Sequence, residues 1–437
     1  MPVESDEVLE VRGISPTPLG KVPVADWLAW PEVRRLVDAF AAGGHDMRFV
    51  GGCVRDVLAK RPVSDVDLAT PLPPDKVMAI LQAAGIKTVP TGIDHGTVTA
   101  VVDGKAFQIT TLRRDVSTDG RHAEVAYTDD WIEDAKRRDF TFNAMSCNPS
   151  GDIYDPFEGM RDLAHGMVRF VGRADDRIRE DYLRILRFFR FYGYYGRPPA
   201  NKNALAACRA RAAKLTELSG ERVRDEILKI LVCPLPADVF VLMRGYGVLE
   251  QILPEAGDVK DLRLVSWLAR RGLGMDHVKP EPIRHLAALL DTDADGAAGV
   301  AGRLRLSNRQ ADRLIALAAP ASAVTPDGGG LENERLIRRL GRETFTDLVL
   351  IGWGRELGAA GRLKADRSRA WWALADFADG WAGQPVPLQG RDLLDIGMTP
   401  GPRVGEVLGA VEAWWEEGGF SADRDACLAH ARALLET

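Results

Sequence analysis

Two aspartates one residue apart, Asp65 and Asp67, are the residues of this sequence best suited to do chemistry. They belong to Asp65-Val-Asp-Leu68, in which polar and apolar residues alternate as in a strand with one wet face. On a strand, the period of two puts both carboxylates on the same face. Two such carboxylates can bridge a pair of Mg²⁺ ions about 4 Å apart, an arrangement that serves in-line transfer of a nucleotidyl group. Alone the pattern is a weak signal, because surface strands often carry acids.

A glycine pair stands before these aspartates. Gly51 and Gly52 follow a predicted strand, Met47–Val50, and precede a short predicted helix, Cys53–Lys60. Glycines at such a turn let the backbone approach a ligand, and the amides at the start of the helix receive phosphate. Arg55, in the first turn of the helix, is suited to hold a triphosphate in a charge-assisted fork. A glycine pair alone is more typical of an ordinary turn, but next to the aspartate pair it predicts a phosphate cradle beside metal ligands.

The elements that must position these residues change character along the chain. Up to about Gly172 strands and helices are mixed, and after it helix follows helix. The sequence therefore predicts an α+β fold, with a small mixed-sheet head followed by a long all-α body. The predicted strands are Met47–Val50, Asp65–Leu68, Thr97–Val102, Ala106–Leu112 and Met167–Val171, and the predicted helices of this part are Val33–Ala42, Cys53–Lys60, Pro74–Ala84 and Glu133–Cys147. Breaks in the helical part are predicted at Pro198–Pro199, Pro234–Pro236, Pro280–Pro282, Gly328–Gly330 and Pro385–Pro387.

The composition narrows the class of protein. A length of 437 residues predicts two to four domains, and a net charge of -6 argues against a general nucleic-acid binder. The segment Arg161–Ile230 nevertheless has 16 Lys/Arg against 9 Asp/Glu, which fits a phosphate-facing surface or, alternatively, a solvated Arg-rich helical face. Five cysteines without a CxxC pair predict a reducing, cytoplasmic setting. Neither a signal peptide nor a membrane span is expected, because no apolar segment of the needed length is present.

Taken in order, the motifs resemble the class II polymerase-β-type nucleotidyltransferases, the group of CCA-adding enzymes and bacterial poly(A) polymerases. The resemblance rests on GGCVRD and DVDLAT in the head, TTLRRDVSTDGRHAEVAYTDDW (110–131, similar to the flexible loop), RRDFTFNAM (137–145, ribose-reading motif), YDPFEGMRDL (154–163, hinge motif), REDYLRILRFFRF (179–191, nucleobase-template motif) and PLQGRDLLDIGMTPGPRVGEVL (387–408, similar to the tail of many bacterial members). It covers residues 49–190 almost continuously. The chain looks most like a bacterial CCA-adding enzyme without an additional His-Asp phosphohydrolase domain, because Arg284–Asp291 contains no His-Asp doublet and His285 is predicted to be a packing residue.

The resemblance implies a function and a set of partners. The function is template-independent addition of CCA to the 3′ end of tRNA from CTP and ATP, with release of pyrophosphate. Asp65 and Asp67 would be the catalytic residues and the Mg²⁺ ligands, and Arg138 and Asp139 would contact the ribose, with Asn143 supporting them. No obligate protein partner is evident. The implied domains are an N-terminal extension (1–30), a polymerase-β-type head (31–172), a helical neck with the template motif (173–235), and a tRNA-binding body (236–384) and tail (385–437).

The template motif can also be interpreted physically. Asp181 and Arg184 are three residues apart on a predicted helix and would share a face. Asp181 offers only acceptors and Arg184 only donors, so together they could mimic a Watson–Crick edge and select C or A over G or U. Arg187 and Arg190 continue the row and could hold the base or the phosphates. The alternative is a surface ion pair on an amphipathic helix.

One residue departs from the family pattern. Polymerase-β-type sites usually take a third carboxylate from a later strand, and Gln108 stands where many relatives have an acid. Either the two aspartates suffice, or Asp139 or Asp115 contributes. Gln108 also leaves open a catalytically weakened RNA-binding relative. Poly(A) polymerase remains a second alternative that the modest charge disfavours, and a CC-only enzyme is a third, disfavoured by the full-length loop from Arg113 to Asp130.

Overall fold

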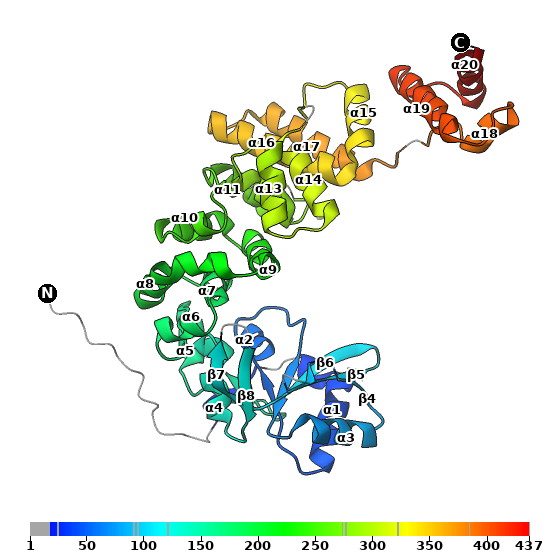
Figure 1. Cartoon of the computed structure of the whole chain (residues 1–437). Helices are drawn as coiled ribbons and strands as arrows, with labels where there is room; N and C mark the ends of the chain where they lie inside the picture. The colour runs from blue at the N-terminus through cyan, green and yellow to red at the C-terminus, as the bar shows by residue number, and fades with distance from the viewer. Residues whose placement is uncertain are drawn as a thin grey trace. The chain divides into compact units, whose positions relative to one another are not determined.

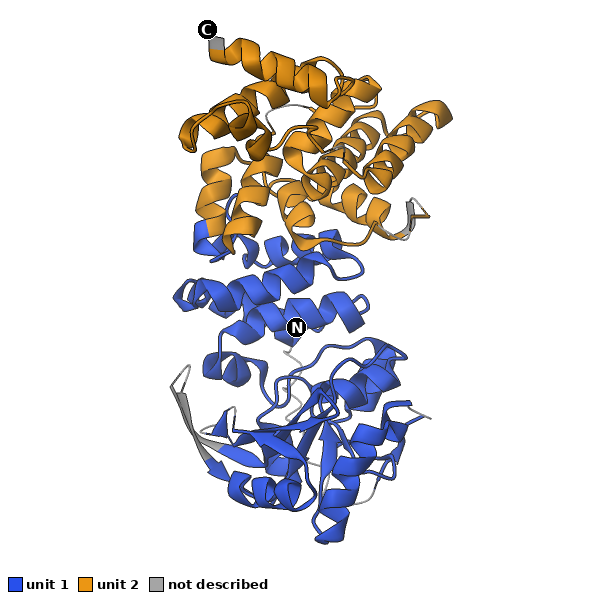
Figure 2. Ribbon diagram, turned by 90° about the vertical axis from the view of Figure 1, so that its right-hand side faces the viewer, with its two compact units in different colours: residues 1–256, 302–306 blue, residues 257–301, 307–437 orange. Residues whose placement is uncertain are grey.

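The computed structural model describes residues 18–436, with gaps at 24–25, 91, 94–95, 120–121, 273, 276–277, 321–322 and 384. The chain divides into two compact units, Met1–Ala256 with Gly302–Leu306, and Gly257–Ala301 with Ser307–Thr437 (Figure 2). All the strands lie in the first unit, and after β10 (Asp152–Tyr154) the named elements of the described chain are helices. The predicted α+β class is therefore confirmed.

The head is built on one mixed sheet of eight strands in the order β1-β10-β9-β2-β3-β6-β5-β4 (Figure 1). Strands β3 and β6 pair in parallel, and the other neighbours are antiparallel. Because Val50 at the end of β2 pairs with Asp67 at the start of β3, the turn that follows β2 adjoins the first residue of β3. The strands not yet bounded are β1 (Gly20–Lys21), β2 (Arg48–Val50), β3 (Asp67–Thr70), β4 (Lys87–Val89), β5 (Thr97–Val102), β6 (Lys105–Thr111) and β9 (Ser146–Cys147).

Three predicted elements of the head form where their sequence patterns indicate. Helix α1 (Pro31–Ala42) starts with a proline in its first turn and buries Leu36 and Phe40. Helix α3 (Pro74–Ala83) also starts with a proline and packs against β4 and β5 (Figure 1). The β5–β6 hairpin turns at Asp103 and Gly104, whose positive φ angles of 49° and 82° match the twist of a two-residue hairpin.

Two predicted elements of the head are wrong. The helix expected at Glu133–Cys147 ends after α4 (Trp131–Lys136), and a 3₁₀ turn, η3 (Thr141–Asn143), and β9 follow. The segment leaves the helix because Phe140 packs on Phe170 with ring centroids 4.7 Å apart. The strand expected at Met167–Val171 is a single bridge between the same two phenylalanines. Tertiary packing of aromatic rings outweighed the local pattern at both places.

The segment that resembles the flexible loop forms a separate two-stranded sheet, β7 (Arg113–Asp119) with β8 (His122–Tyr127). The helices of the first unit then follow in sequence. They are α2 (Gly52–Leu58) in the head, then α5 (Gly159–His165), α6 (Ala174–Glu180), α7 (Leu183–Tyr195), α8 (Lys202–Arg211), η4 (Ala212–Glu217), α9 (Gly220–Leu231), α10 (Pro236–Gly245) and η5 (Leu249–Gln251). Helix α7 packs against both α9 and α10.

The second unit consists of helices, and the three breaks predicted within it, at Pro280–Pro282, Gly328–Gly330 and Pro385–Pro387, fall between or at the start of its helices, whereas other breaks were not predicted. Helix α16 supplies much of its core, and a separate apolar cluster around Val411 and Trp415 holds the last three helices together. His285, predicted to be a packing residue, is fully buried on α12. The helices are α11 (Lys260–Trp267), the π-helical turn η6 (Leu268–Gly272), α12 (Pro282–Leu289), α13 (Ala294–Arg303), α14 (Asn308–Ala318), α15 (Gly330–Leu340), α16 (Arg342–Ala360), α17 (Ala365–Gly380), α18 (Gly390–Asp395), α19 (Pro402–Glu417) and α20 (Arg424–Glu436). Among the described residues, no helix is both long and apolar enough to span a membrane.

Candidate active site

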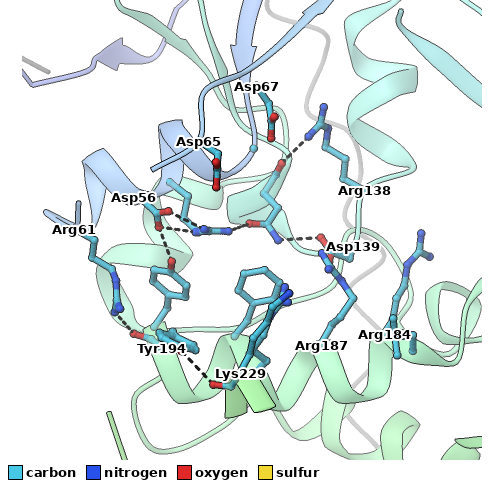
Figure 3. Close-up of a pocket in the computed structure, with 18 of the residues that line it drawn as sticks. Asp56, Arg61, Asp65, Asp67, Arg138, Asp139, Arg184, Arg187, Tyr194 and Lys229 are labelled. Carbon is cyan, nitrogen blue, oxygen red and sulfur yellow. Dashed lines mark hydrogen bonds and ion pairs between the residues drawn. The ribbon is translucent and has the colours of Figure 1, made fainter. Parts of the chain in front are cut away.

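An open pocket of about 900 Å³ lies in the first unit, between the head sheet and helices α7 and α9 (Figure 3). Its position follows from the elements already described, because the turn after β2, the start of β3, the segment after α4 and successive turns of α7 all reach it. All twelve residues that the sequence predicted for the site line this pocket: Gly51, Gly52, Arg55, Asp65, Asp67, Arg138, Asp139, Asn143, Asp181, Arg184, Arg187 and Arg190.

The two aspartates face the pocket as the alternating pattern predicts, although the strand is shorter than expected. Strand β3 begins at Asp67, so Asp65 precedes it and is exposed. Val66 between them is 4% exposed and points into the core, which leaves the two carboxylates on the pocket side (Figure 3). Burial raises the pKa of Asp67, the negative charge of Asp65 raises it further, and Arg138 opposes both effects.

These carboxylates fit a divalent metal ion. In the described chain neither forms an ion pair with a basic side chain, whereas Asp56, Asp139 and Asp181 around them all do. Asp65 accepts a hydrogen bond of 2.8 Å from the Ser64 hydroxyl. Two hard oxygen donors that repel each other and lack a cation are a suitable donor pair for such an ion. No cluster of three or more His, Cys, Asp or Glu of metal-binding geometry occurs among the residues described.

The structure bears on which residue could be a third metal ligand beside Asp65 and Asp67. Gln108 is exposed on β6 and does not line the pocket, but it precedes Ile109, the partner of Leu68, and so lies level with Asp67 on the neighbouring strand. The alternative ligand Asp139 is occupied elsewhere, as described below. The side chain of Asp115 lies outside the described residues.

The glycine turn has a conformation that requires glycine. Gly51 has φ +69°, and a Cβ there would lie 3.3 Å from Nη1 of Arg138. Arg55, one turn into α2, is held by two partners. It forms an ion pair of 3.0 Å with Asp56 and donates from Nη1 to Oδ1 of Asn143 over 2.6 Å.

Asp139 forms the buried centre of the next group. Its Oδ1 accepts from Nδ2 of Asn143 over 2.9 Å and from the Phe140 amide, and its Oδ2 accepts from Nε of Arg187 over 2.7 Å. Burial acts to raise the pKa of Asp139, but Arg187 and Asn143 outweigh it and hold the pKa below its ordinary value. Both oxygens are therefore engaged, so Asp139 does not serve as a third metal ligand in this arrangement.

Asp134 on α4 joins this group to the start of the hairpin. Its side chain is 4% exposed and forms ion pairs with Arg137 at 2.7 Å and with Arg138 at 3.2 Å. Its Oδ1 also accepts from the backbone amide of Arg113, the first residue of β7, over 3.3 Å. The two arginines and the hairpin thus share one carboxylate.

The predicted helix carrying Asp181 and Arg184 is wrong. Helix α6 ends at Glu180, Asp181 is extended with φ −156°, and α7 begins at Leu183. The break is stabilised because Oδ1 of Asp181 accepts from the Leu183 amide over 3.0 Å, in place of a helical bond. The two side chains do not pair with each other. Asp181 accepts from Arg222 over 2.7 Å, and Arg184 pairs with Glu180 and donates to the Arg137 carbonyl over 3.1 Å.

Sequence reasoning missed several residues of the pocket. Glu226 on α9 is 4% exposed and pairs with Arg190 at 2.9 Å, which fixes α7 against α9 behind the pocket. The spacing of Arg222 and Glu226 on one amphipathic helix was the signal available, since an acid on a buried face needs a partner. The pocket is also lined by Asp56, Arg61, Tyr194, Tyr195, Arg222 and Lys229, which the sequence analysis did not name.

A carboxylate pair, a glycine turn and several arginines around one open pocket are features expected of a site that binds a nucleotide and a metal ion. Comparisons with known proteins identify the family. Residues 47–169 match the poly A polymerase head domain, and residues 201–259 match the probable RNA and SrmB-binding site of polymerase A.

Individual relatives extend this match over most of the chain. The mitochondrial CCA tRNA nucleotidyltransferase 1 of Danio rerio is 34% identical over 399 residues, which is 90% of this chain and 88% of that protein. The CCA-adding enzyme of Geobacillus stearothermophilus is 38% identical over 249 residues, which is 55% of this chain and 60% of that protein. The crystal structure of the Bacillus stearothermophilus CCA-adding enzyme in complex with CTP matches with a TM-score of 0.70 at 28% identity, over 93% of this chain and 97% of that one. The chain belongs to the CCA tRNA nucleotidyltransferase family, whose members are nucleotidyltransferases that use metal ions.

Proposed function

We propose that this enzyme adds C, C and A in turn to the 3′ end of tRNA, from CTP and ATP, without a nucleic-acid template and with release of pyrophosphate. One observation carries the proposal beyond family membership. The unpaired carboxylates of Asp65 and Asp67 face the same pocket as the base-reading candidates Asp181 and Arg184. Chemistry and base selection would therefore act on one bound nucleotide.

Asp65 and Asp67 are the residues proposed to hold Mg²⁺. When bound there, Mg²⁺ supplies charge neutralisation at the reacting phosphate and lowers the pKa of the attacking 3′-hydroxyl. The turn at Gly51 and Gly52 lets phosphate oxygens approach the backbone, and Arg55, which Asp56 holds in place, binds the triphosphate.

Arg138, Asp139 and Asn143 are proposed to bind the ribose. Asn143 connects Arg55 to Asp139 through its side chain, so the triphosphate and ribose contacts are held in one hydrogen-bonded group. Arg187 and Arg190 hold the base or the phosphates from α7.

Asp181 and Arg184 are proposed to select C or A. In the structure Asp181 pairs with Arg222, and Arg184 pairs with Glu180. A base that forms hydrogen bonds with Asp181 and Arg184 therefore competes with, or adds to, both ion pairs. A base with the wrong pattern of donors and acceptors leaves these groups unpaired, and this penalty produces selectivity.

The remainder of the chain is proposed to bind tRNA. The head (31–172) carries the chemistry, the neck (173–235) the base-reading group, and the body (236–384) and tail (385–437) bind tRNA. The match of residues 201–259, which span the end of the neck and the start of the body, to an RNA-binding family model supports RNA binding by this part of the chain. We also propose a cytoplasmic location, consistent with five free, buried cysteines, whereas the vertebrate relatives carry mitochondrial names.

The test is incorporation by purified protein of each labelled NTP in turn into tRNA that ends at the discriminator base, with the products sequenced. We expect C, C and A to be added, followed by a stop. Runs of A would instead identify a poly(A) polymerase, and products ending at CC a CC-only enzyme. Binding of tRNA without any incorporation would identify a weakened relative and contradict the proposal.

A further inference from the structure

The basic residues that line the pocket differ in how their charge is compensated. Seven of them form an ion pair with a carboxylate: Arg55, Arg137, Arg138, Arg184, Arg187, Arg190 and Arg222. The other two, Arg61 and Lys229, have no carboxylate within ion-pairing distance in the part of the chain that the structure describes. An uncompensated cation on the wall of a pocket attracts an anion more strongly than one that already has a partner.

Arg61, Tyr194 and Lys229 form a continuous surface, called here the basic ledge. Arg61 follows α2 and donates from Nη1 to the Tyr194 carbonyl over 3.0 Å. Its guanidinium lies 5.1 Å from the ring centroid of Tyr194. The Tyr194 hydroxyl donates to the Lys229 carbonyl over 3.1 Å, which connects the end of α7 to α9. The ledge therefore has the Tyr194 ring against the Arg61 guanidinium and bonded to the backbone of Lys229, whose side chain lines the same pocket.

The ledge lies across the pocket from Arg138, Asp139 and Arg184, and beside Arg55, since the guanidinium groups of Arg55 and Arg61 lie 4.7 Å and 5.1 Å from the ring centroid of Tyr195. Figure 3 shows Arg61, Tyr194 and Lys229 on one side of the pocket and Arg138, Asp139 and Arg184 on the other, with Asp65 and Asp67 above them. Transfer of a nucleotide needs a second substrate whose 3′-hydroxyl reaches the same carboxylates. An RNA strand that ends there carries backbone phosphates and a terminal base immediately next to that hydroxyl.

We propose that the basic ledge binds the 3′ end of the acceptor RNA strand. Arg61 and Lys229 contact its last backbone phosphates, and the ring of Tyr194 stacks on a terminal base, the combination that single-stranded RNA requires. This inference rests on the proposed function, since it assigns the second substrate of the same site. The triphosphate of the incoming nucleotide has the same phosphate chemistry, so the test must separate the two ligands.

The test measures binding directly, in the absence of any reaction. Arg61→Gln, Lys229→Gln and the double variant are compared with Lys76→Gln, an exposed lysine of α3 outside the pocket. Affinity for tRNA that lacks CCA is measured over a range of salt concentrations, and affinity for CTP is measured separately. Lys229 is exposed and forms no ion pair in the described chain, so Lys229→Gln carries the test even if Arg61→Gln weakens the fold.

We expect the double variant to bind the tRNA about 10- to 100-fold more weakly at low salt, and to bind CTP within about twofold of wild type. The slope of log affinity against log salt should become flatter by about 0.7 for each phosphate of the single strand that the variant no longer neutralises. The Lys76→Gln control should match wild type in both assays.

Two results would overturn the inference. In the first, the ledge variants bind tRNA with the same affinity and the same salt dependence as Lys76→Gln. The other is a loss confined to CTP, which would assign the two cations to the triphosphate. Failure of the proposed function would look different, because wild type would bind the tRNA with normal ledge dependence and still add no nucleotide.

Discussion

The two units each contain a buried aspartate flanked by arginine, in very different settings. On α16, Asp347 has a fully buried side chain and pairs with Arg284 at 2.7 Å and Arg313 at 2.6 Å. At the pocket, Asp139 pairs with Arg187, whose side chain is 31% exposed and lines the open pocket. The first cluster is closed, and the second is open to a ligand. The same pair of residue types therefore serves the stability of the body in one unit and, as proposed, substrate contact in the other.

The largest expected effect tests the closed cluster. Asp347→Ala removes the carboxylate that pairs with the buried guanidinium of Arg284, while Arg313 keeps Glu281 and Glu343, and should lower the free energy of unfolding by about 3–5 kcal/mol. CMP addition per folded molecule should remain close to wild type. Denaturant unfolding and single-turnover rates measure the two quantities. The matched variant Asp139→Ala should show the opposite balance, with a smaller loss of stability and a larger loss of rate, and equal behaviour of the two variants would remove the distinction.

Asp67→Ala tests the unpaired carboxylates. The variant should lose more than about 100-fold in single-turnover CMP addition, because it removes a proposed metal ligand that supports the charge of the transition state. Filter binding of tRNA should stay nearly normal, since Asp67 forms no ion pair in the described chain that holds the fold together. Near-normal turnover would end the two-metal assignment.

Asp181→Ala tests whether an ion pair at the pocket reads the base. Loss of the acceptor at this partly exposed side chain costs about 1–3 kcal/mol of discrimination when a base covers it, which corresponds to roughly 5- to 150-fold in the preference for C and A over G and U. Incorporation of all four NTPs by wild type and variant, with products sequenced, gives this preference. The control Arg222→Gln removes only the partner of Asp181 and should keep most of the selectivity. A uniform loss of rate in Asp181→Ala, with selectivity retained, would make Asp181 structural.

The smallest effect is expected at Gln108. Because Gln108 lies level with Asp67 on the neighbouring strand and is exposed, Gln108→Glu should be tolerated and should lower the Mg²⁺ concentration needed for half-maximal activity by a few fold. A Mg²⁺ titration of activity provides the measurement. Full activity with an unchanged midpoint would place residue 108 outside the metal shell, and a damaged variant would indicate that the added charge is poorly solvated.

Sequence reasoning was most successful where chemistry and periodicity coincide. The alternation around Val66 predicted that Asp65 and Asp67 face the same side, and the glycine pair predicted the turn at Gly51. The end of the strand pattern after Gly172, with prolines and glycines between helical segments, predicted that the rest of the chain is helical. It failed where contacts distant in sequence decide the conformation. The aromatic packing of Phe140 on Phe170 ends a predicted helix, and the capping bond of Asp181 divides another. The pairing of Arg190 with Glu226 has no local signature, because 36 residues separate them.

The hydrogen bond from the Arg113 amide to Asp134 has a consequence for how the β7–β8 hairpin can vary. The carboxylate that orients Arg137 and Arg138 accepts a hydrogen bond from the main chain at the first residue of the hairpin. Most substitutions and length changes beyond the first residue of the hairpin therefore preserve this attachment. Proline at position 113 is the exception, because it has no amide hydrogen to donate. The sequence of the hairpin can therefore change without loss of the hydrogen bond that connects residue 113, through Asp134, to the arginines of the pocket.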